Sequence, residues 1–79
     1  MTSETSAEAL FTSSLQPSQH PTTSQIDAAI RTSLQNHHGA RGCAAACAAE
    51  YGEHPETAVA RMRWALTQIG MLREACVAA

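Results

Sequence analysis

Three histidines and two cysteines between residues 37 and 54 are the side chains of this sequence best suited to holding a metal ion. Cys43 and Cys47 are four residues apart, which places both thiols on one face of a helix. His37 and His38 could complete a four-ligand zinc set with them, and His54 is a further candidate. The spacing is not that of a zinc finger, and cysteine in an alanine-rich segment usually packs as a small apolar residue. We therefore predict reduced, buried thiols and no metal or other cofactor.

Catalytic motifs are missing from the sequence. It contains no glycine-rich phosphate loop, nucleophile elbow or paired carboxylates, and Asp27 is better explained as a helix cap. A cysteine and a histidine could be paired, but a helical domain of about 55 residues rarely provides the concave pocket that such chemistry needs. We predict that the protein is not an enzyme.

Residues 1–24 differ in composition from the rest of the chain. They contain eleven Ser or Thr, two of the three prolines, two acids and no Lys or Arg. Such a segment cannot bury enough apolar surface to offset its chain entropy, so we predict a disordered arm. Residues 7–11, with Leu15 one turn beyond, form an apolar island. It either docks on a partner or remains an exposed apolar patch on a solvated tail.

From Ser24 onward the pattern is helical. Ser24 and Asp27 have the layout of a capping box, and Gly39 can supply the left-handed residue that ends the helix. Between them apolar residues recur at helical spacing: Ile26, Ile30 and Leu34.

Two further helices are expected in residues 43–69. The first is short, begins after Gly42 and ends at Gly52. The second begins at Pro55, whose fixed φ suits a first helical turn, and ends near residue 69 because Gly70 is a stop signal. The composition of residues 71–79 favours a short fourth helix over a strand.

The apolar positions divide the third helix into an inner and an outer face. Its predicted inner residues are Ala58, Met62, Ala65, Leu66 and Ile69. Across the whole domain, the residues predicted to be mostly buried are Ile30, Leu34, Ala48, Tyr51, Met62 and Ile69, with Ala48 where the second and third helices cross.

Trp64 lies on the outer side of the third helix, so a second surface must cover it. The candidates are residues 71–77 and a second copy of the chain, and we favour the second copy because symmetric dimers are common and Trp is frequent at interfaces. Ala60 and Thr67 would then lie beside Trp64 in the dimer contact.

The order of a long helix, a short helix, a tight turn and a long helix is that of helix-turn-helix DNA-binding domains. Residues 47–58 resemble the motif core of DeoR-type winged-helix regulators. A small Ala48 precedes a turn glycine, Gly52, and Pro55-Glu56-Thr57 opens the next helix. The resemblance covers about 45 residues. It departs at Glu53, where the family has an aliphatic residue, and at His54, where it has a serine cap, and no full wing is expected.

The resemblance implies a small DNA-binding transcriptional regulator whose third helix enters the major groove. His54 and Thr57 would reach phosphates or bases, Arg61 and Arg63 would neutralise phosphates or read guanine, and Arg41 would anchor the backbone. The predicted DNA-facing set is Arg41, His54, Glu56, Thr57, Ala60, Arg61, Arg63 and Thr67.

The charge balance leaves a second interpretation open. The net charge is −2, and the five arginines of residues 25–79 are matched by five acids, which is a weak electrostatic footprint for DNA binding. The alternative is a protein–protein interaction adaptor or inhibitor that binds through Trp64 or the N-terminal arm.

The sequence thus predicts an all-α fold, with a tri-helical helix-turn-helix bundle at residues 25–79 behind a disordered arm at residues 1–24. No apolar run approaches the ~20 residues of a membrane span, and the N-terminus lacks the pattern of a secretory signal. We therefore expect a cytoplasmic protein with no membrane contact.

Overall fold

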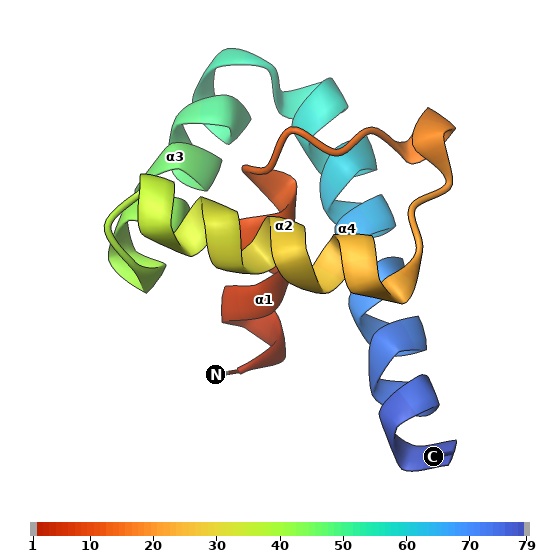
Figure 1. Ribbon diagram of the computed structural model, residues 1–79. Helices are drawn as coiled ribbons and strands as arrows, with labels where there is room; N and C mark the ends of the chain where they lie inside the picture. The colour runs from red at the N-terminus through yellow and green to blue at the C-terminus, as the bar shows by residue number, and fades with distance from the viewer. Residues whose placement is uncertain (1, 79) are drawn as a thin grey trace.

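The structure is a computed structural model that describes residues 2–78, with side chains described up to residue 74. Its elements, in chain order, are α1 (Ser3–Phe11), the 3-10 turn η1 (Pro17–Gln19), α2 (Thr23–Asn36), α3 (Ala40–Glu53) and α4 (Pro55–Ala78) (Figure 1). The predicted all-α class is confirmed. No helix within residues 2–78 is both long and apolar enough to cross a bilayer.

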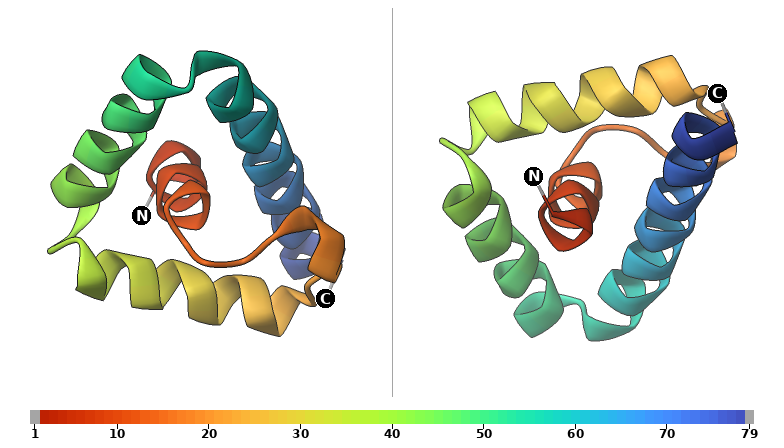
Figure 2. Two further views of the ribbon diagram at one scale, coloured as in Figure 1. Left: turned by 90° about the horizontal axis from the view of Figure 1, so that it is seen from above. Right: turned by 90° about the horizontal axis from the view of Figure 1, so that it is seen from below.

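Helix α1 is the centre of the fold. Figure 2 shows α2, α3 and α4 as three sides of a triangle, with α1 running through its middle. Ala7, Ala9, Leu10 and Phe11 are each at most 4% exposed. The prediction of a disordered arm at residues 1–24 is therefore wrong, because the apolar island of residues 7–11 packs inside its own chain.

Hydroxyl side chains help α1 to form. The Thr2 side chain accepts a hydrogen bond from the Thr5 backbone N–H (3.1 Å), which caps the start of the helix. After its end, the Ser13 hydroxyl donates to the Leu10 carbonyl (2.6 Å). Some of the Ser and Thr residues that predicted disorder thus satisfy the backbone groups that a short helix leaves open.

Helix α2 begins slightly earlier than predicted. Thr22 and Gln25 form its capping box, in which each side chain accepts a hydrogen bond from the other residue's backbone N–H. The expected box at Ser24 is wrong by two residues. Asp27 is not a cap, because it pairs with Arg31 one turn along the exposed face of the helix.

A close turn joins α2 to α3. His38 (φ 61°) and Gly39 (φ 100°) are both left-handed, and the Gly39 N–H donates to the Leu34 carbonyl (2.7 Å). The predicted stop is therefore correct, but His38 holds the first left-handed position. Gly42 lies within α3, where an added Cβ would be 1.5 Å from the His37 carbonyl oxygen. Its small size allows the two helices to approach.

Two glycines that were predicted to end helices lie inside them. Gly52 belongs to α3, which is joined to α4 by His54 alone, and α4 continues through Gly70 to residue 78. The predicted turn at Gly52 and stop at Gly70 are wrong, whereas the start at Pro55 is confirmed. Glycine only weakens a helix, by about 1 kcal/mol relative to alanine, so a single glycine does not have to end it.

The main core joins α1 to the inner faces of the other three helices. Its buried members are Ala7, Ala9, Leu10, Ile26, Ile30, Cys43, Ala65 and Ile69. Phe11, Cys47 and Ala58 form a second buried cluster. Burial of Ile30 and Ile69 was predicted correctly, and Leu34 and Met62 are half-buried.

Three predicted core residues are exposed. Helix α3 turns Cys43 and Cys47 inward, so Ala48 lies about 100° further round the helix and faces solvent. It is not at a helix crossing. Tyr51 is 38% exposed at the end of α3, and Leu66 is 50% exposed on the outer side of α4.

Candidate functional site

Arg61 connects α4 to the end of α1. Its Nε donates to the Phe11 carbonyl (2.7 Å), and its Nη2 donates to the carbonyls of Ser13 (2.9 Å) and Leu15 (2.9 Å). The carbonyls at a helix C-terminus lack partners within the helix, and the planar guanidinium can meet several of them at once. Arg61, predicted to contact DNA, is thus half-buried, and its guanidinium is already hydrogen-bonded to three backbone carbonyls of the chain.

Two aromatic rings lie close to this guanidinium. The Arg61 Cζ is 5.1 Å from the centre of the Trp64 ring and 5.9 Å from that of Phe11. Phe11 in turn stacks on Tyr51, with the ring centres 6.0 Å apart and the planes 12° from parallel. Burial lowers the pKa of Arg61. The four side chains form a continuous stack that links α3, α1 and α4.

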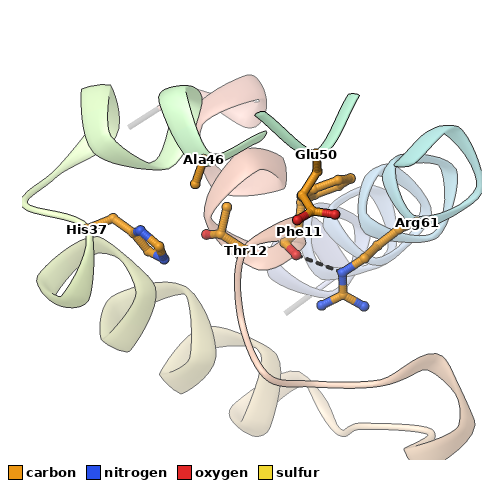
Figure 3. Close-up of a pocket in the computed structure, with 6 residues that line it drawn as sticks. All are labelled: Phe11, Thr12, His37, Ala46, Glu50 and Arg61. Atoms are coloured by element: carbon orange, nitrogen blue, oxygen red, sulfur yellow. Dashed lines mark hydrogen bonds between the residues drawn. The ribbon is translucent and has the colours of Figure 1, made fainter. Parts of the chain in front are cut away.

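A cavity of about 250 Å³ opens beside this stack. Figure 3 shows Arg61 and Glu50 at one end of it, His37 at the other and Thr12 between them. The remaining lining residues are Phe11 and Ala46. Among the described side chains, Arg61 has no carboxylate within 4 Å. The cavity holds no described cysteine and no close acid–base pair.

The other residues predicted to face DNA are exposed, and they do not form one surface. Arg41 lies in the first turn of α3, and His54 follows the last, so about 20 Å separates them along the helix at 1.5 Å per residue. Thr57 and Arg63 lie on α4. Also exposed on α4 are Glu56, Ala60 and Thr67. The structure therefore brings part of the predicted set together on α4 but leaves Arg41 at the far end of α3.

Trp64 forms one wall of a groove between α4 and the segment before α2. The groove has a volume of about 310 Å³. It is lined by Pro17, His20, Pro21, Trp64, Gln68 and Met71. Trp64 is half-buried against the core, whereas Met71 is 57% exposed.

Trp64 is partly covered by the main core and by the Arg61 guanidinium, and it shares the groove with residues 17–21, a segment predicted to belong to the disordered arm. The prediction that only residues 71–77 or a second copy could cover this ring is wrong in that respect. Part of the 71–77 segment, including Val77, lies outside the residues whose side chains are described. Pro17 and Pro21 were the feature of the sequence that indicated order in this segment, because proline fixes φ and restricts the backbone.

The predicted metal ligands are not gathered around one point. Cys43 and Cys47 are buried among apolar side chains, which confirms their predicted role as small core residues. Within the described part of the chain, no three His, Cys, Asp or Glu side chains are placed to hold a metal ion.

The Cys47 thiol should make stability depend on alkaline pH. Burial, followed by the charges of Glu8 and Cys43, raises its pKa from 9.0 to about 11. Above pH 9 the unfolded chain loses this proton first, so the free energy of unfolding should fall as the pH rises from about 9 to 11. Urea unfolding at several pH values measures this slope. Cys47→Ala should make it shallower, and an unchanged slope would contradict the assignment.

The chain was compared with family models, curated proteins and solved structures, and none of them matches it.

Proposed function

We propose that the protein is a protein-interaction module that binds its partner at the groove lined by Trp64 and Met71. The observation that carries the proposal is the combination of a half-buried Trp and a largely exposed Met in one groove of about 310 Å³. Tryptophan is enriched among the residues that dominate binding energy at interfaces, and methionine adapts its shape to a partner.

The surroundings of Trp64 support this role. The Arg61 guanidinium lies against its ring, and Arg61 is itself fixed by three backbone carbonyls. Pro17 and Pro21 line the same groove and have restricted backbones. A surface that is already rigid loses less conformational entropy on binding, which favours affinity.

The interaction is tested by affinity capture from the native host with matched variants. Proteins that bind the wild type and Leu66→Lys, but not Met71→Lys, would be groove-dependent partners. Met71 and Leu66 are both exposed residues of α4, so neither change should disturb the fold. Equal capture by Met71→Lys and the wild type would show that the groove is not the binding surface.

DNA binding is the second candidate, favoured by the exposed Arg63 and Thr57 near the start of α4. It has less support, because the Arg61 guanidinium is already hydrogen-bonded to backbone carbonyls and because two carboxylates are exposed where α3 joins α4: Glu53, the last residue of α3, and Glu56, in the first turn of α4. Carboxylates there would repel phosphates.

If Arg63 neutralises one phosphate, Arg63→Ala should weaken binding to duplex DNA and reduce the salt slope of log affinity by about one unit. Fluorescence anisotropy at ~50 and ~200 mM salt measures both quantities. Arg31→Ala is the control, because Arg31 is paired with Asp27 on α2. No binding by the wild type at the lower salt would reject this candidate.

A further inference from the structure

We propose that the partner at the Trp64 groove is a second copy of this chain, bound through an antiparallel contact between the two α4 helices. This inference rests on the proposed function, because it names the occupant of the same groove. The contact surface is a stripe along α4 made of Ala60, Trp64, Thr67 and Met71. Three of these residues are exposed, and Trp64 is half-buried.

The spacing of the stripe is that of a helix–helix seam. Its residues are separated by steps of four, three and four, which is the alternation that keeps side chains along the line of contact between two helices. Gln68, one turn after Trp64, lines the groove on one side of this seam. The stripe is therefore both correctly spaced for a partner helix and bordered by a groove.

The order of side-chain sizes selects the direction of the pairing. Along the stripe, small and large residues alternate: Ala60, Trp64, Thr67, Met71. In an antiparallel pair, the register that places Ala60 opposite the second copy's Met71 also places Trp64 opposite the second copy's Thr67. Every layer then joins a large side chain to a small one. A parallel pair would place Trp64 against Trp64 and Ala60 against Ala60, which overfills one layer and leaves a void in the other.

The C-terminal half of α4 provides a second argument for a helical partner. Figure 1 shows that α4 extends past the helices that enclose α1, so that its last turns project from the body. Arg73 still donates a hydrogen bond to the Ser3 hydroxyl of α1 (3.0 Å), and the turns beyond Arg73 project. A helical segment with little tertiary packing is marginally stable in water. In the antiparallel register, residues 71–76 would lie along the first six residues of the second copy's α4, residues 55–60.

The first experiment measures self-association by sedimentation equilibrium between about 1 and 200 µM. A contact limited to one helix face is at the small end of specific interfaces, so we expect a dimer with a dissociation constant in the micromolar range. Met71→Lys should weaken the dimer at least about tenfold. Leu66→Lys is the matched control, because Leu66 is also exposed on α4 but lies about 130° around the helix from the stripe. It should leave the dimer unchanged.

The second experiment tests the register. Ala60→Glu and Met71→Lys should each disrupt the dimer, because each buries one charge opposite an uncharged residue. In the double variant, the introduced carboxylate of each chain meets the introduced ammonium of the other, so dimerisation should return to within about threefold of the wild type. Circular dichroism checks that all variants remain folded.

The outcomes separate this inference from the proposed function. A wild type that stays monomeric at 200 µM overturns the inference, whereas groove-dependent capture of another protein would leave the proposed function standing. Disruption by Leu66→Lys but not by Met71→Lys would move the contact to another face of α4 and overturn both. Single variants that disrupt the dimer without recovery in the double variant would overturn the antiparallel register.

Discussion

Leu10→Ala should destabilise the folded protein by about 2–5 kcal/mol, the range observed when a buried leucine is truncated and leaves a cavity. Leu10 is fully buried, and it packs in the main core with Ile26, Ile30, Cys43, Ala65 and Ile69. In a domain of this size, each kcal/mol changes the melting temperature by about 4–8 °C. The melting temperature of Leu10→Ala should therefore fall by about 10 °C or more.

Leu66→Ala is the control for this experiment. It makes the same chemical change at a residue that is 50% exposed on α4, so its effect should stay within about 0.5 kcal/mol. The pair of variants also distinguishes a central α1 from a disordered arm. If residues 1–24 were disordered, both variants would melt with the wild type, and that result would contradict the fold described for α1.

The location of α1 shows where the sequence pattern was insufficient. Periodicity identified Ile26 and Ile30 because each lies on a helix with one apolar face and one polar face. Helix α1 is instead surrounded on several sides, so its apolar residues 7–11 form no stripe. The small size of Ala7 and Ala9 becomes meaningful only when three other helices are known to surround them.

The residues taken as signals for helix boundaries predicted the structure correctly only where the residue itself imposes a backbone conformation. Pro55 begins α4 as predicted, because proline fixes φ and lacks an N–H group. Gly52 and Gly70 only permit a break, and the helices continue through both, because one glycine costs a helix only about 1 kcal/mol relative to alanine. The same limit applies to the candidate site. The sequence shows that Arg61 and Trp64 are on one helix, but it cannot show that the carbonyls of Phe11, Ser13 and Leu15 end beside them.

Arg61→Met should cost about 2–3 kcal/mol, even though the residue is only half-buried. Methionine retains much of the aliphatic volume but removes the guanidinium, so the carbonyls of Phe11, Ser13 and Leu15 lose their donors. Hydrogen bonds to a charged donor contribute about 1.5–3 kcal/mol, and water can replace part of that contribution at a half-exposed position. Urea unfolding gives the change, with Arg63→Met as the control on the exposed face of α4.

Arg61→Lys separates the effect of charge from that of shape. A lysine ammonium is a compact donor that cannot match the fork that reaches three carbonyls, so this variant should recover only part of the lost stability. Loss of Arg61 should also increase hydrogen exchange in residues 13–21, because the segment that borders the Trp64 groove is attached to α4 through these bonds. Full stability in Arg61→Met, with unchanged exchange in that segment, would mean that the guanidinium does not hold the groove in place. Arg61 would then again be available for a phosphate.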